Sequence, residues 1–182
     1  NISFQLMKLN YIYLPFDIPT SNLADALKAM RVLGIRGLNV TIPHKEKIIQ
    51  YMDHVSEEAS TVGAVNTVVN EGNQFFGFNT DINGVIESLA PYKKQLGKSI
   101  ATVIGSGGAA RSVLYSLIRH FKVSRINIIN RTEERSEGIK DYFKDKMHFD
   151  NIFTYELMAK ENIEVYNSSK LIVNTTTLGM FP

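Results

Sequence analysis

The sequence contains no cysteine and no tryptophan among its 182 residues. The lack of cysteine excludes disulfide bonds and thiolate-ligated metal sites, and the four histidines lack metal-ligand spacing, so no metal is predicted. Lysine plus arginine (20) nearly balance aspartate plus glutamate (18), and no basic stripe indicates nucleic-acid binding. The sequence has no run of about 18 apolar residues and no signal-peptide pattern. These absences favour a cytoplasmic protein that does not bind membranes.

The most informative feature present is the segment GSGGAA at residues 105–110. An apolar run at 100–104 predicts a strand before it, and apolar residues at helical spacing predict a helix after it. This is the G-x-G-x-x-A form of the dinucleotide-binding turn. Gly105 permits the tight turn, and Gly107 lets the backbone approach a pyrophosphate. The helix N-terminus supplies free N–H groups to that anion.

The end of the next predicted strand, residues 124–130, favours NADP over NAD. NAD-binding proteins carry an acidic residue near this point, which accepts hydrogen bonds from the ribose 2′-hydroxyl. Here Asn130, Arg131 and Thr132 stand at the strand end, with Arg135 one helical turn further on. Guanidinium and hydroxyl groups bind a 2′-phosphate, whereas a carboxylate would repel it. The alternative interpretation is a solvated helix start with Thr132 as N-cap.

Alternating strands and helices predict the α/β class. We expect residues 1–98 to form an N-terminal α/β substrate domain with a mostly parallel sheet, and residues 99–182 a Rossmann-like NADP-binding domain. A strand is expected at 11–16, a helix after Pro43, and a hairpin around Gly72. The chain starts without methionine, and its second part has too few strands for a whole nucleotide domain. We therefore expect both domains to lack a terminal part.

Polar residues stand where predicted strands begin or end in the first domain. Thr41 and Lys45 bracket a strand-to-helix turn, Asn66 begins a strand, and Asp81 opens a helix. Loops at the ends of a sheet commonly gather ligands. Each residue alone also has a plain structural interpretation: a solvated lysine, a turn asparagine, or an N-cap aspartate stabilised by the helix dipole.

Six ordered segments, NVTIPHK, GAVNT, FNTDING, GSGGAA, NRTEER and NTTTLGM, make the chain similar to shikimate dehydrogenases. The resemblance implies reversible NADPH-dependent reduction of 3-dehydroshikimate to shikimate, in the pathway to chorismate and the aromatic amino acids. It implies that Lys45 and Asp81 are the catalytic pair and that both contact the substrate, whose hydroxyls Thr41 and Asn66 bind. The implied cofactor-binding residues are Gly105, Ser106, Gly107, Gly108, Ala109, Asn130, Arg131, Thr132, Arg135, Thr176, Met180 and Glu57.

Other functions remain open at this stage. One alternative is a quinate/shikimate dehydrogenase with broader substrate and cofactor use. Another is a non-catalytic NADP-binding regulatory homologue, which would not need both Lys45 and Asp81. The expected partner is a small-molecule substrate, and the expected assembly is a monomer or homodimer. The family's Ser-x-Ser motif, which binds the substrate carboxylate, would precede residue 1.

Overall fold

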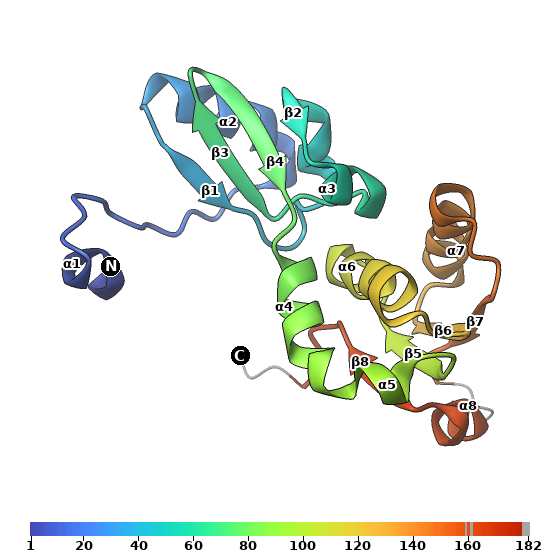
Figure 1. Cartoon of the computed structure of the whole chain (residues 1–182). Helices are drawn as coiled ribbons and strands as arrows, with labels where there is room; N and C mark the ends of the chain where they lie inside the picture. Colours follow the sequence, from blue (N-terminus) through green and yellow to red (C-terminus); the bar gives the residue numbers. More distant parts are fainter. Residues whose placement is uncertain (159, 161, 180–182) are drawn as a thin grey trace.

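The computed structural model describes residues 1–158, 160 and 162–179. Its described residues form two sheets, and Figure 1 shows helix α4 (Asp81–Leu89) leading from the first sheet to the second. We call residues 1–80 the first lobe and the described residues from 81 onward the second lobe. The predicted α/β class is confirmed. No helix among the described residues is long and apolar enough to cross a bilayer.

The sheet of the first lobe has the strand order β1-β3-β4-β2. Its elements are α1 (Ile2–Leu6), η1 (Thr20–Asn22), α2 (Leu23–Val32), β1 (Gly37–Asn39), η2 (Lys47–Tyr51), β2 (His54–Val55), α3 (Glu57–Val62), β3 (Thr67–Glu71) and β4 (Gln74–Phe78). The β1–β3 and β3–β4 pairs are antiparallel, and β2–β4 is parallel. The prediction of a mostly parallel sheet is therefore wrong in detail. The hairpin predicted around Gly72 is confirmed: both φ angles at Gly72 and Asn73 are positive, and the chain folds straight back from β3 into β4.

One face of this sheet is covered by α2. Its buried residues Leu23, Leu27 and Met30 recur at helical spacing and pack in one cluster with Val68 and Phe75 of the sheet. The segment after Pro43 forms turns followed by the short 3-10 helix η2, not the predicted α-helix. In that segment Ile48 is buried and serves the same core.

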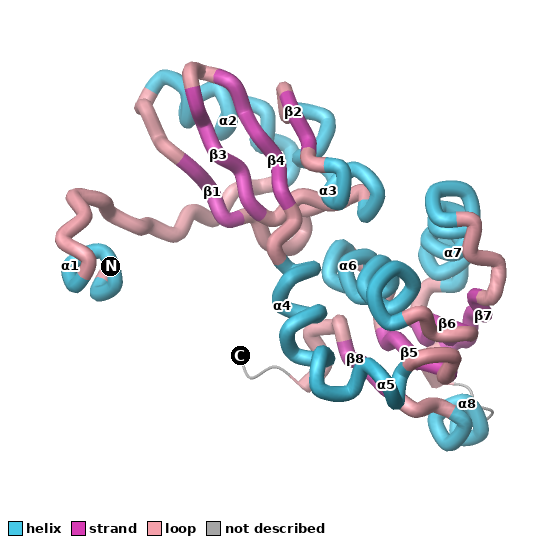
Figure 2. Tube along the Cα trace, viewed as in Figure 1, coloured by secondary structure: helices cyan, strands magenta, loops and turns pink. Residues whose placement is uncertain are grey.

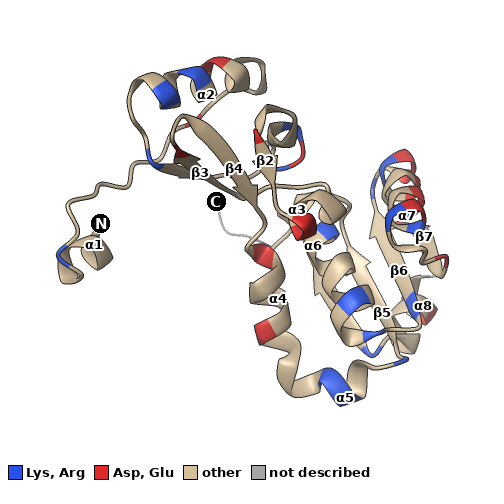
Figure 3. Cartoon of the chain, turned by 45° about the horizontal axis from the view of Figure 1, so that its top comes forward, with Lys and Arg blue, Asp and Glu red and all other residues tan. Residues whose placement is uncertain are grey.

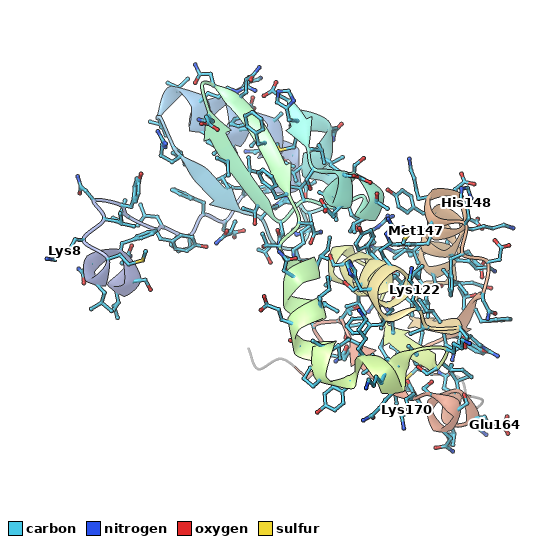
Figure 4. All side chains as sticks on the ribbon, in the orientation of Figure 1. Lys8, Lys122, Met147, His148, Glu164 and Lys170 are labelled. Carbon is cyan, nitrogen blue, oxygen red and sulfur yellow. The ribbon has the colours of Figure 1, made fainter. Side chains whose placement is uncertain are left out.

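The strand predicted at residues 11–16 is absent from the structure. Figure 2 shows this segment as loop, and Figure 4 shows Lys8 on the same arm, well apart from the labelled residues of the second lobe. Tyr11, Ile12 and Leu14 are each more than half exposed. Apolar residues alone do not make a strand, because a strand also needs a neighbour to hydrogen-bond its backbone.

The sheet of the second lobe is parallel throughout its described pairs, in the order β7-β6-β5-β8. Its elements are α4, η3 (Ala90–Tyr92), α5 (Lys93–Leu96), β5 (Ile100–Ile104), α6 (Gly108–Ser116), η4 (Leu117–Phe121), β6 (Arg125–Asn130), α7 (Glu133–Met147), β7 (Ile152–Glu156), α8 (Asn162–Ser168) and β8 (Leu171–Asn174). The strands predicted at 100–104 and 124–130 are thus confirmed.

In chain order these strands take the spatial order 3-2-1-4, which is the first part of the dinucleotide-binding arrangement. The strand order reverses between β5 and β8, and ligands of such sheets bind at this switch point, beyond the carboxyl ends of the strands. Ala101 and Val103 of β5 are fully buried in one core with Val113 and Leu114 of α6. Ile82 and Leu96 join this core, so α4 and α5 pack with the second lobe.

Candidate functional site

Lys45 and Asp81 form an ion pair at the boundary between the lobes. The Lys45 Nζ lies 2.6 Å from Asp81 Oδ2, and the two side chains are 15% and 33% exposed. Asp81 is the first residue of α4, where the positive end of the helix dipole stabilises a carboxylate. Lys45 is held in the turn before η2, where its carbonyl accepts a hydrogen bond from the Val65 N–H at 2.8 Å. A nearly buried ammonium is therefore presented by a fixed backbone.

The buried side chain of Asn66 holds the other oxygen of this carboxylate. Its Nδ2 donates to Asp81 Oδ1 at 2.7 Å and to Thr80 Oγ1 at 3.1 Å. Its Oδ1 accepts from the Thr80 N–H at 2.9 Å and from the Thr67 hydroxyl at 2.9 Å. Both Asp81 oxygens therefore have partners, which orients the carboxylate toward Lys45. The structure gives Asn66 this orienting task, and its predicted contact with a substrate hydroxyl stays a prediction.

Thr80 and Thr67 also belong to this network, although neither was predicted to be a site residue. Both stand beside predicted residues, Thr80 before Asp81 and Thr67 after Asn66, in the segments FNTDING and GAVNT. Their position next to predicted site residues is the sequence feature that could have indicated them. The predicted residue Thr41 lies in the exposed turn after β1 and makes no side-chain hydrogen bond to any described residue. Its hydroxyl is free to meet a ligand.

The glycine-rich turn follows β5 at the switch point, and its first glycine is required by geometry. Gly105 has a φ of +106°, and a Cβ at this position would lie 2.6 Å from the Thr175 Oγ1. The Thr175 hydroxyl in turn donates to the Ile104 carbonyl at 2.7 Å. The ends of β5 and β8 therefore touch, and only glycine allows the approach.

The rest of the turn opens onto the start of α6. Gly107 is the N-cap, with no side-chain cap, and a Cβ there would meet nothing within 4 Å. Ser106 is buried beneath the turn, and Ala109 lies in the first turn of α6. Open space in front of an uncapped helix N-terminus fits the pyrophosphate of a dinucleotide.

Gly108 brings this turn against the ion pair. A Cβ at Gly108 would lie 3.0 Å from the Cβ and 3.3 Å from the Cδ of Lys45. The predicted nucleotide turn and the predicted catalytic lysine come from different lobes, and the fold places them in direct contact.

The residues predicted to select NADP lie together at the end of β6. Asn130 Nδ2 donates to the Thr132 carbonyl at 2.8 Å, which fixes the loop leading into α7. Thr132 occupies the N-cap position of α7, yet its side chain makes no capping bond. The Thr132 side chain therefore does not cap α7, as the alternative interpretation had it. Arg131 and Arg135 are exposed, and neither forms an ion pair with a described residue.

Three predicted cofactor residues remain: Thr176, Glu57 and Met180. Thr176 follows β8, and its methyl group would contact a Cβ at Gly105, so it lies at the switch point. Glu57 is exposed in the first turn of α3. The predicted contact between Glu57 and the cofactor stays a prediction. Met180 lies outside the described residues.

The comparisons with known proteins agree with this arrangement. A family model described as the shikimate dehydrogenase substrate binding domain matches residues 1–68. Over 182 residues, the chain is 38% identical to the shikimate dehydrogenase (NADP(+)) of Caldanaerobacter subterraneus subsp. tengcongensis. The match covers 100% of this chain and 63% of that protein. Over its whole length the chain is similar to the shikimate dehydrogenase family.

Solved structures of this family are similar to the chain in three dimensions. Shikimate dehydrogenase from Aquifex aeolicus aligns with a TM-score of 0.82 at 32% identity, over 98% of this chain and 62% of that one. Shikimate 5-dehydrogenase from Thermus thermophilus, in complex with NADP(H) and shikimate, aligns with a TM-score of 0.75 at 31% identity, over 96% of this chain and 60% of that one. The chain thus spans less than two thirds of the length of these family members.

Proposed function

We propose that this chain carries the catalytic and cofactor-binding residues of an NADP-dependent shikimate dehydrogenase. The reaction is 3-dehydroshikimate plus NADPH plus a proton giving shikimate plus NADP⁺, and it is reversible. The observation that carries the proposal is the contact between Gly108 of the nucleotide turn and Lys45 of the ion pair. A hydride transfer enzyme needs its proton donor beside its nicotinamide site, and this contact supplies that proximity.

Lys45 is the proton donor in reduction. When a carbonyl is reduced, negative charge develops on its oxygen, and a positioned ammonium stabilises that charge and donates the proton. In the reverse direction the neutral amine accepts the proton of the hydroxyl. The low exposure of Lys45 strengthens this electrostatic effect, because the interaction is screened by less water.

Asp81 orients the ammonium of Lys45 and binds a substrate hydroxyl. Both of its oxygens already have partners, Lys45 and Asn66, so the carboxylate is held in one direction. Thr41 is exposed and stands four residues before Lys45, and it is proposed to bind a second substrate hydroxyl.

The described residues fit a bound NADP. The open space at Gly107 and the uncapped start of α6 would hold the pyrophosphate. Asn130, Arg131, Thr132 and Arg135 would hold the 2′-phosphate, with Thr176 near the nicotinamide side. The bound nicotinamide would supply the hydride. The predicted division into a substrate domain at 1–98 and an NADP-binding domain at 99–182 stays a prediction, and the packing of α4 and α5 with the second lobe favours a boundary nearer residue 80. We also propose a cytoplasmic location and a monomer or homodimer.

The test is a spectrophotometric assay with shikimate and NADP⁺, followed by quinate and by NAD⁺. Activity with shikimate and NADP⁺ alone supports the proposal. Comparable turnover of quinate or NAD⁺ would instead support a quinate/shikimate dehydrogenase of broader use. Calorimetric titration with NADP⁺ distinguishes an enzyme from a non-catalytic homologue, because the homologue would bind the cofactor but show no turnover.

A further inference from the structure

The C-terminal end of α3 is closed by side chains from the other lobe. The last carbonyls of a helix have no partner within it and must find donors elsewhere. Two carbonyls near this end, those of Ser60 and Val62, accept hydrogen bonds from Tyr142 Oη at 3.0 Å and Arg111 Nη1 at 3.2 Å. Arg111 belongs to α6 and Tyr142 to α7, so both bonds cross the lobe boundary.

Arg111 is the centre of this cluster. It lies in the first turn of α6, where the helix dipole disfavours a cation, and its side chain is only 14% exposed. Its guanidinium lies 4.4 Å from the centre of the Tyr142 ring, in cation–π contact. A buried cation at an unfavourable helix position needs external partners, and these come from α3 and α7.

Gly63 makes the approach possible. It ends α3 in the left-handed conformation, with a φ of +70°. A Cβ there would lie 2.7 Å from Tyr142 Oη and 3.0 Å from Arg111 Nη1. Glycine thus serves two purposes at this position: it caps α3, and its lack of a side chain leaves room for Tyr142 and Arg111 of the second lobe.

The cluster reaches the chain neighbour of the catalytic lysine. Arg111 Nε lies 3.4 Å from Glu46 Oε2, and this Nε is buried without a hydrogen-bond partner among the described residues. Glu46 directly follows Lys45. Since α6 begins at the glycine turn and its Arg111 contacts Glu46, a movement of α6 would shift both the glycine turn and the segment that carries Lys45.

We propose that Arg111 is a positioning residue that sets the distance between the glycine turn and Lys45. It joins α6 to the end of α3 and to Glu46, with Tyr142 as its support. The effect of Arg111 on catalysis rests on the proposed function. The effect of Arg111 on the spacing of the lobes does not, because that spacing can be measured without any activity. Loss of the guanidinium should let the lobes move apart, because α3 would lose a donor and Glu46 a counter-charge.

The decisive measurement uses the natural absence of cysteine. Glu71→Cys and Lys144→Cys, both at exposed positions, allow one spin label to be placed on each lobe. Pulsed dipolar spectroscopy then reports the distribution of distances between the lobes. We expect Arg111→Met to broaden or lengthen this distribution, Arg111→Lys to restore it in part, and the control Arg119→Met, exposed on η4, to leave it unchanged.

Kinetics of the same variants test the consequence for Lys45. We expect Arg111→Met to lower kcat about tenfold, with the Kd for NADP⁺ nearly unchanged, because a displacement of about 1 Å can cost up to about 100-fold. An equal loss in NADP⁺ affinity would make Arg111 a phosphate ligand and overturn the proposal.

A second variant covers the case in which Arg111→Met does not fold. Glu46→Gln removes only a partly exposed carboxylate and should also alter the distances. Unchanged distributions in the folded Arg111 and Glu46 variants would overturn the inference. If the parent chain neither binds NADP⁺ nor turns over shikimate, the proposed function fails, and the distances still decide the role of Arg111.

Discussion

Gly108 packs directly on the side chain of Lys45, so that a Cβ added to the glycine would lie 3.0 Å from that of the lysine. The two residues are far apart in sequence and belong to different lobes. Their contact joins a dinucleotide-type turn to an ion pair suited to proton transfer. Figure 3 shows a contrasting pattern elsewhere, with acidic and basic residues mixed along α7, as is typical of a solvated helix face.

The first prediction concerns the ammonium of Lys45. Lys45→Ala should lower kcat for shikimate oxidation by at least ~100-fold, the lower range for general acid–base catalysis. The exposed neighbour Lys47 provides a matched control, since Lys47→Ala removes the same charge outside the ion pair. Steady-state assays of both variants measure these rates. Equal kcat values for Lys45→Ala and the parent would show that Lys45 is not the proton donor.

A second prediction separates a glycine needed by the fold from one needed by the ligand. Gly107→Ala meets no described atom within 4 Å, so thermal unfolding should change little. The new methyl group would, however, enter the space proposed for the pyrophosphate, and the Kd for NADP⁺ should rise on the order of tenfold or more.

The matched control is Gly138→Ala, which also enters open space but lies within α7. Alanine should stabilise that helix by roughly 0.5–1 kcal/mol, without an effect on NADP⁺ binding. Calorimetric titration and thermal unfolding of both variants make the comparison. Unaltered NADP⁺ affinity in Gly107→Ala would place the pyrophosphate elsewhere.

A third prediction tests the choice of cofactor. Arg131→Ala removes a donor of charge-assisted hydrogen bonds, each worth roughly 1.5–3 kcal/mol, so the Kd for NADP⁺ should rise about tenfold or more. The Kd for NAD⁺ should not change, because NAD⁺ lacks the 2′-phosphate. Arg119→Ala controls for loss of one positive charge. A parallel loss of affinity for both cofactors would contradict the phosphate role.

The fourth prediction concerns stability in mild acid. Burial lowers the pKa of His120 from its usual 6.5, and the positive charges of Lys93, Arg119 and Lys122 lower it further, while Glu58 opposes them. The unfolded chain therefore binds a proton at a higher pH than the folded chain does. Stability from this residue is complete above about pH 6.5 and is lost as the pH falls through the folded pKa.

Chemical denaturation across this pH range tests the assignment. His120→Gln should flatten the decline in the free energy of unfolding below about pH 6.5. His148→Asn, at an exposed helix end with a left-handed backbone that asparagine tolerates, serves as the control and should retain the decline. An identical slope in His120→Gln and the parent would show that other groups cause it.

Features that depend on local order follow from residue type and spacing alone. The glycine pattern at 105–110, the strands on either side of it and the buried stripe of α2 follow from spacing and residue type, since these interactions are made within a few residues. The arm at 11–16 shows the converse: its residues are apolar enough for a strand, and without a hydrogen-bonded neighbour they form none.

Contacts between residues far apart in the sequence depend on how the folded elements pack. Lys45 and Asp81 lie in different sequence motifs, and only the resemblance to a family implied that they form a pair. Their 2.6 Å contact depends on how the first lobe places the Lys45 turn beside the start of α4. Arg111 carried no functional signal beyond its place after the glycine turn, because its partners lie in α3, in α7 and beside Lys45. Side-chain contacts across lobes depend on the packing of whole elements, and no local pattern of residues encodes them.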